Sequence, residues 1–233
     1  MTLRAVLALP LIAVCTVALG LPAILFGMLS RFDLVRSVTV LWGRAVLWTL
    51  GIEVTVAGAQ HCPAGPAVYA ANHASVLDIP ILYAHLPVDF RIIHKRSLYL
   101  VPVMGLYLYA TGHIGIDRGN AFRAHKGLQR AAARVRDGGS NLVVFPEGTR
   151  SRGGEVGPFK RGLFALALEA EVPVVPLSLI GVKLVGRGGL DVHAGTVRLL
   201  VHPPIPTAGR GQEQAATLAE EVRTVVTGGC AAA

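Results

Sequence analysis

The sequence predicts an α/β fold with a mostly parallel central sheet flanked by helices, preceded by an N-terminal membrane-associated helical segment. Two observations support this. Short apolar strands alternate with helical segments after residue 50, which is the pattern of a layered parallel sheet. Before that point, no charged residue occurs at positions 5–29. We therefore divide the chain into N-terminal membrane-associated helices, residues 1–50, and an α/β domain, residues 51–233.

The N-terminal run accounts for an unusual composition. The chain is 52% hydrophobic and only 15% charged, whereas soluble domains are about one quarter charged. About 20 apolar residues suffice to cross a bilayer, so we expect a retained membrane segment. A cleaved signal peptide is the alternative, because Arg4 is basic and small residues lie near position 20. Pro10 and Pro22 leave open a kinked spanning helix or a shallow re-entrant helix.

A second helix is expected at residues 34–50. Its only charges are Arg36 and Arg44, which share one stripe with Gly43, and the rest of its surface is apolar. A broad apolar face beside a thin basic stripe is typical of a helix at the lipid interface. The alternative is an amphipathic helix buried in the core.

The remaining elements follow from hydrophobic periodicity. Alternating or fully apolar runs predict strands at residues 52–56, 67–70, 90–93, 113–116, 142–145, 172–179 and 197–201. Helices are expected at residues 79–86, 121–137, 162–170 and 212–227, the second and the last closed by glycine pairs. The most loop-like interior stretch is residues 186–189.

The charge distribution indicates anionic partners. The net charge is +8, and residues 91–136 carry many basic side chains against one acid, Asp117. No nucleic-acid motif accompanies them, so we predict no nucleic-acid partner and favour anionic lipid head groups and phosphorylated substrates. The three cysteines form no disulfide framework or zinc motif, which is consistent with a cytoplasm-facing domain.

The first candidate for chemistry is A-N-H-A-S-V-L-D, residues 71–78, at the carboxyl end of a predicted buried strand. His73 has the chemistry of a general base, and Asp78 would orient it. The two can meet if a helix begins between them, with Ser75 as its cap, because one regular helix would separate them by about 140°. Alternatively, Ser75 and Asp78 form a capping box and His73 is a bystander.

The second candidate is F-P-E-G-T-R-S, residues 145–151, which follows the most apolar strand. Gly148 lets backbone N–H groups approach a ligand, and Arg150 offers a planar fork for phosphate. The alternative is an ordinary turn with a Glu147–Arg150 surface pair. Asp117 and Arg118 end another predicted strand, where they would bind a ligand or only cap a helix.

Together and in this order, these segments resemble the glycerolipid acyltransferase family, which includes the bacterial 1-acylglycerol-3-phosphate acyltransferases. Its N-H-x-x-x-x-D block matches residues 72–78, its I-D-R strand end residues 116–118, its F-P-E-G-T-R-S block residues 145–151, and its V-P-x-x-P strand residues 172–176. The resemblance covers roughly residues 51–206. Two positions depart from it: Gly115 stands where the family carries an aromatic or larger residue, and Ser97 where it often carries an acid.

The resemblance implies an acyltransferase catalytic domain. His73 would take a proton from a glycerol hydroxyl that attacks an acyl thioester, and Asp78 would orient His73. Arg118, Gly148 and Arg150 would hold the acceptor phosphate. The other implied substrate-binding residues are Lys95, near the head group, Thr149, and Glu147, which would position a hydroxyl or an arginine.

The implied reaction converts a lysophospholipid, by default 1-acylglycerol-3-phosphate, to phosphatidic acid; an ornithine-lipid precursor is another acceptor. Acyl-CoA or acyl carrier protein is the co-substrate, with no metal or organic cofactor. The implied location is the bacterial inner membrane, among membrane phospholipids, with the catalytic domain facing the cytoplasm. Two rival hypotheses are a membrane-associated thioesterase or phospholipase using the same His–Asp pair, and a non-catalytic lipid-binding protein. Intact His73–Asp78 and Glu147–Arg150 pairs would argue against the latter.

Overall fold

The computed structural model describes residues 3–117, 119–151, 155–188 and 191–231. A seven-stranded sheet has the order β1-β9-β6-β2-β5-β3-β4, and every neighbouring pair is parallel except β6 and β9. Its strands are β1 (Ile52–Ala57), β2 (Val68–Ala71), β3 (Phe90–Lys95), β4 (Ile114–Ile116), β5 (Asn141–Val144), β6 (Val174–Ile180) and β9 (Gly195–Val201). This arrangement confirms the predicted α/β fold with a mostly parallel sheet.

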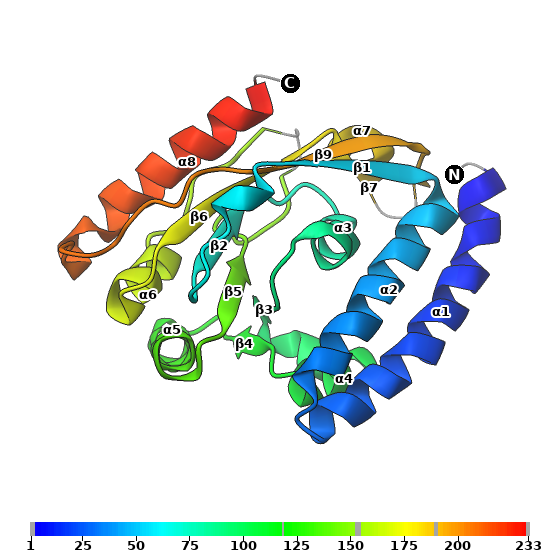
Figure 1. The fold of residues 1–233 in the computed structure, drawn as a ribbon, viewed down its shortest axis with the longest axis horizontal. Coiled ribbons are helices and arrows are strands. Elements are labelled where there is room, and N and C mark those ends of the chain that lie inside the picture. The colour runs from blue at the N-terminus through cyan, green and yellow to red at the C-terminus, as the bar shows by residue number, and fades with distance from the viewer. Residues whose placement is uncertain (1–2, 118, 152–154, 189–190, 232–233) are drawn as a thin grey trace.

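Helices cover both faces of the sheet (Figure 1). The α-helices are α1 (Leu3–Met28), α2 (Phe32–Leu50), α3 (Asp78–His85), α4 (Met104–Ala110), α5 (Ala121–Gly138), α6 (Gly162–Ala170), α7 (Val182–Val185) and α8 (Ala215–Ala231). Short 3-10 helices occupy η1 (Ala59–His61), η2 (Arg96–Leu100) and η3 (Gln212–Gln214). Helices α5, α6 and α8 lie on one side of the sheet, and α2 and α3 lie on the other.

The central strand β2 divides two hydrophobic cores. Tyr69 and Ala71 face the core that includes Leu47 of α2 and Leu82 of α3. Val68 and Ala70 face the core built from α5, α6 and α8. All four β2 residues are buried, because β2 lies between β6 and β5 and is covered on both faces. The carboxyl end of β2 is therefore a fixed point in the middle of the domain.

Two predictions about glycines are wrong. The C-terminal helix does not stop at Gly228 and Gly229 but continues to Ala231. Gly229 instead permits close packing on β6, since a Cβ there would lie 2.5 Å from Ser178 Oγ. The stretch expected as a loop contains β7 (Gly186–Gly188), which pairs with β8 (Asp191–Val192).

Helices α1 and α2 form an antiparallel hairpin beside the sheet (Figure 1). Helix α1 runs through both of its prolines without a break, and Trp42 Nε1 donates to Thr16 Oγ1 across the hairpin at 3.0 Å. Residues 8–28 of α1 are long and apolar enough to cross a membrane, with a mean hydropathy of 2.4. That property, shared with signal sequences, is weakly consistent with membrane association.

Helix α2 combines the two alternatives weighed for it. Arg36 and Arg44 are exposed, as are Leu41 and Trp48. Gly43 is not part of this exposed stripe but is buried, because the opposite face of α2 packs on α3. A Cβ on Gly43 would lie 2.7 Å from the carbonyl oxygen of Pro80. The hairpin is thus joined to the domain through a close helix contact.

This contact predicts that Gly43→Ala destabilises the fold although alanine is the better helix former. The added methyl group meets backbone atoms of α3 that cannot move away, and such overpacking costs about 1–3 kcal/mol. Gly20→Ala in α1 is the matched control, since its Cβ would meet nothing within 4 Å. Thermal unfolding in detergent should show a lower midpoint for Gly43→Ala and an equal or higher one for Gly20→Ala. Equal midpoints for both variants would contradict the contact.

Candidate active site

The loop after β2 carries the first group of polar residues. Its first residue, Asn72, is buried and forms two hydrogen bonds with the backbone of β6. Asn72 Nδ2 donates to the Leu179 carbonyl at 3.0 Å, and Leu179 N–H donates to Asn72 Oδ1 at 2.8 Å. This pair of hydrogen bonds fixes the start of the loop against the neighbouring strand.

His73 and Asp78 are in direct contact. His73 Nδ1 lies 2.6 Å from Asp78 Oδ2, and the Asp78 side chain is fully buried. The same oxygen accepts the backbone N–H groups of Ala74 at 2.9 Å and Ser75 at 3.1 Å. The capping of backbone N–H groups and the contact with His73 are therefore not alternatives. One carboxylate oxygen of Asp78 makes both.

The helix begins between the two residues, as the pairing requires. Helix α3 starts at Asp78, so Pro80 falls in the first turn, where its missing N–H leaves no helical bond unmade. Ser75 is not the cap that was predicted, because it lies before Leu77, the cap residue, and its hydroxyl accepts the Leu77 N–H at 3.3 Å. The loop is held by Asp78 instead.

This geometry determines which nitrogen of His73 can act as a base. An ionised carboxylate only accepts hydrogen bonds, so Nδ1 carries the proton and Nε2 presents its lone pair. The imidazole stacks on the Phe145 ring with 4.2 Å between centroids, and its side chain remains 19% exposed. Nε2 has no hydrogen-bond partner among the described residues. The arrangement can remove a proton from a bound hydroxyl group.

Glu147 connects the second motif to the first. Its Oε1 accepts the backbone N–H of His73 at 2.8 Å, and its Oε2 accepts that of Gly157 at 3.2 Å. Ser151 N–H also donates to the His73 carbonyl at 2.8 Å. These two hydrogen bonds hold the turn at residues 145–151 against the His73 loop.

The expected Glu147–Arg150 pair is not formed among the described residues. The turn directs Glu147 inward, where it is 9% exposed, whereas Thr149 and Arg150 are exposed. Glu147 therefore contacts backbone N–H groups rather than an arginine, and Arg150 makes no ion pair within the described segments. Glu147 therefore does not position Arg150 as proposed for one of its two roles, and the Arg150 guanidinium is exposed to solvent.

A lysine that was not singled out from the sequence lies against this turn. Gly148 has a positive φ of 75°, and a Cβ there would lie 2.6 Å from Lys160 Nζ. Lys160 N–H donates to the Pro146 carbonyl at 3.0 Å, which holds the two segments together. No motif marks Lys160, because its approach to Gly148 depends on how the chain returns after the turn.

Lys95, another of the predicted residues, lies at the same edge of the sheet as the His73 loop. Lys95 is exposed at the carboxyl end of β3, which is parallel to β5 and β2. Arg118 lies outside the described residues. Its neighbour Asp117 binds Arg123 at 2.9 Å. No group of His, Cys, Asp or Glu residues in the described segments is arranged to hold a metal ion.

Comparison with protein families gives a match over most of this domain. A family model described as Acyltransferase matches residues 53–180. A 1-acyl-sn-glycerol-3-phosphate acyltransferase of Limnanthes douglasii is 34% identical over 166 residues, 71% of this chain and 59% of the relative. The alpha form of the same enzyme from Homo sapiens is 34% identical over 180 residues, 76% of this chain and 64% of the relative. The chain thus spans under two thirds of these relatives.

The fold also has a solved counterpart. The crystal structure of the 1-acyl-sn-glycerophosphate (LPA) acyltransferase PlsC from Thermotoga maritima superposes with a TM-score of 0.78 at 26% identity. The similarity covers 97% of this chain and 96% of that one, so it includes the N-terminal helices.

The contacts of Glu147 predict a local effect of its removal. Glu147→Ala leaves the N–H groups of His73 and Gly157 without their acceptors, at a cost of about 1–3 kcal/mol. Amide hydrogen exchange, measured by mass spectrometry, should become faster in peptides that contain these residues. Glu53→Ala, which removes an exposed carboxylate on β1, serves as control. Unchanged exchange at residue 73 in Glu147→Ala would show that the carboxylate does not hold the loop.

Proposed function

The chain belongs to the Acyltransferase family, and we propose that it transfers a fatty acyl group from an acyl thioester to the free hydroxyl of a lysophospholipid. The acceptor we propose is 1-acyl-sn-glycerol-3-phosphate, the substrate named for its relatives, and the product is phosphatidic acid. The observation that carries this proposal is the contact of His73 with the buried Asp78, fixed beside the turn at residues 145–151.

The proposed reaction uses His73 Nε2 as the general base. As Nε2 takes the proton of the glycerol hydroxyl, the oxygen attacks the thioester carbonyl carbon. The C–S bond then breaks, and the thiol group leaves with the proton returned by His73. Asp78, 2.6 Å from Nδ1, stabilises the imidazolium formed between these steps. General-base assistance of this kind contributes about 10²–10⁴-fold to a rate.

The acceptor phosphate is proposed to bind at the turn. Gly148 brings the backbone close, and the Arg150 guanidinium, exposed beside it, can bind two phosphate oxygens at once. Lys160 adds an ammonium group at the same turn. Lys95 at the neighbouring strand end, together with Arg118 and Thr149, completes the proposed set. Glu147 supports it indirectly by holding the His73 loop.

The proposed location is the membrane surface, with residues 1–50 as the attachment and residues 51–233 as the catalytic domain. The packing of α1 against α2 and α4 supports a segment that stays with the folded chain. We propose the bacterial inner membrane, with the catalytic domain in the cytoplasm, where acyl-CoA and acyl carrier protein are available. The proposed chemistry requires no metal or organic cofactor.

Replacing His73 tests the reaction. His73→Ala should lose acyl transfer by at least about 10²-fold, the lower end of general-base assistance, and keep its unfolding midpoint. Purified protein is incubated with an acyl thioester and 1-acylglycerol-3-phosphate, and lipids are identified by mass spectrometry. His125→Ala, which removes an exposed histidine on α5, should behave as wild type.

The products distinguish the rival functions. Diacyl lipid supports the transferase, whereas free fatty acid alone identifies a thioesterase or phospholipase using the same pair. Lipid binding with no thiol release identifies a non-catalytic lipid-binding protein. Full transfer activity in His73→Ala would contradict the proposed mechanism.

Replacing Arg150 tests the phosphate site. Arg150→Ala should raise KM for the lysophospholipid by about tenfold or more, since a charge-assisted hydrogen bond contributes about 1.5–3 kcal/mol. The KM for the acyl donor should hardly change. Steady-state kinetics with each substrate varied in turn give both values, and Arg198→Ala on β9 removes an exposed arginine at a distance from the turn. A defect confined to the acyl donor would contradict the assignment.

A further inference from the structure

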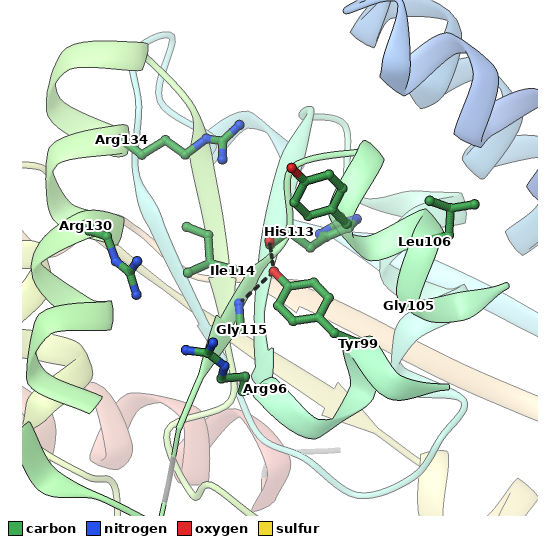
Figure 2. A pocket seen from close by; sticks show the side chains of 10 residues that line it. Arg96, Tyr99, Gly105, Leu106, His113, Ile114, Gly115, Arg130 and Arg134 are labelled. Carbon is green, nitrogen blue, oxygen red and sulfur yellow. Dashed lines mark hydrogen bonds between the residues drawn. The ribbon is translucent and has the colours of Figure 1, made fainter. Parts of the chain in front are cut away.

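A second site lies beyond the β4 edge of the sheet. A cavity of about 720 Å³ opens between α5, α4 and η2 (Figure 2). It is lined by Arg96, Tyr99, Gly105, Leu106, Tyr109, His113, Ile114, Gly115, Arg130 and Arg134. None of these residues belongs to the His73 loop or to the turn at residues 145–151. The cavity is therefore not accounted for by the proposed acyl-transfer chemistry.

Tyr99 forms the floor of the cavity and closes the open edge of β4. Its hydroxyl donates to the His113 carbonyl at 2.8 Å and accepts the Gly115 N–H at 3.1 Å. A Cβ on Gly115 would collide with the Tyr99 ring, and one on Gly105 with the Tyr99 backbone. This explains the glycine found where the family carries a larger residue: the Tyr99 ring occupies that space.

The charge of the cavity is uniformly positive. Arg130 and Arg134 extend from α5 on one side, and Arg96 extends from the start of η2 below them (Figure 2). No acidic residue lines the cavity within the described segments, and none of the three arginines forms an ion pair there. Asp117, just before α5, binds Arg123, and Asp137, near the end of α5, binds Arg136 instead. The three guanidinium groups are therefore available to an anionic ligand. Phosphate oxygens match the planar geometry of a guanidinium group.

The rim of the cavity is apolar and exposed. Leu106 is 52% and Tyr109 76% exposed, and the segment between Tyr99 and Gly105 exposes Leu100, Val101, Val103 and Met104. Helix α4 packs on α1, where a Cβ on Gly27 would lie 2.7 Å from the Ala110 carbonyl oxygen. The exposed apolar residues of α1 thus continue toward this rim, as expected for a surface in contact with lipid.

We propose that this cavity binds the phosphate head group of an anionic diacyl phospholipid while the apolar rim contacts its acyl chains. The arginines recognise the phosphate, and the exposed Tyr109 suits the boundary between head groups and hydrocarbon. A soluble anion would use the arginines but leave the apolar rim without a partner. An acidic protein would match the charge but would leave the exposed apolar rim unexplained. The site holds a membrane lipid that is not consumed in the reaction.

Lipid binding by the full chain in a neutral detergent tests this site without acyl donor, so its outcome is independent of acyl transfer. The protein receives an equal mixture of dioleoylphosphatidylglycerol and dioleoylphosphatidylcholine, and native mass spectrometry counts the lipids bound. Both lipids offer a phosphate, but the arginines repel the choline ammonium group, so wild type should prefer phosphatidylglycerol by about tenfold. The double variant Arg130→Gln/Arg134→Gln, on α5, should lose this preference. The single variant Arg96→Gln, on η2, should lose part of it.

The matched control is Arg136→Gln/Arg198→Gln, which removes the same number of exposed arginines outside the cavity. It should retain the preference, and unfolding midpoints should show that all variants fold. The proposal is overturned if both double variants lose the preference equally, or if the cavity variant keeps it. Displacement of the lipid by millimolar inorganic phosphate would identify a free-anion site instead. If Arg130→Gln/Arg134→Gln lost binding to an acidic acyl carrier protein but kept the lipid preference, the cavity would be assigned to a protein partner.

Discussion

One carboxylate oxygen determines the geometry of the candidate active site. Asp78 is fully buried, and a buried carboxylate is costly unless hydrogen bonds compensate for its lost hydration. Its Oδ2 receives the Ala74 and Ser75 N–H groups and the His73 ring, and its position at the start of α3 adds the favourable end of the helix dipole. The loop conformation, the start of the helix and the tautomer of His73 are thus consequences of a single buried charge. The same charge is the natural partner of an imidazolium ion.

A second carboxylate extends this constraint across the sheet. Strands β2 and β5 are parallel neighbours, so the loops that follow them emerge side by side. Glu147, after β5, accepts hydrogen bonds from the His73 N–H group in the loop after β2 and from the Gly157 N–H group. Asp78 and Glu147 therefore both accept hydrogen bonds from backbone N–H groups. The proposed role of His73 therefore depends on these two acids, because they fix the backbone that carries its ring.

The sequence allowed some of these relations to be predicted and hid others for a physical reason. The His73–Asp78 contact spans five residues, and helix geometry alone requires a helix start between them. The Glu147–His73 bond spans 74 residues, and no local pattern encodes it. Periodicity placed Gly43 beside Arg36 on α2, but periodicity cannot say which face another helix covers. Helix α4 is short and apolar, so its pattern did not distinguish it from a loop or strand.

The candidate active site and the N-terminal hairpin both contact helix α3. Gly43 of α2 approaches the carbonyl of Pro80, two residues after Asp78, so the hairpin rests on the first turn of α3. A shift of the hairpin relative to the sheet would displace that turn and, with it, the oxygen that holds His73. The apolar hairpin thus supports the active-site geometry as well as any contact with lipid. Because interiors are close-packed, the position of the α1–α2 hairpin and the alignment of the proposed base are mechanically linked.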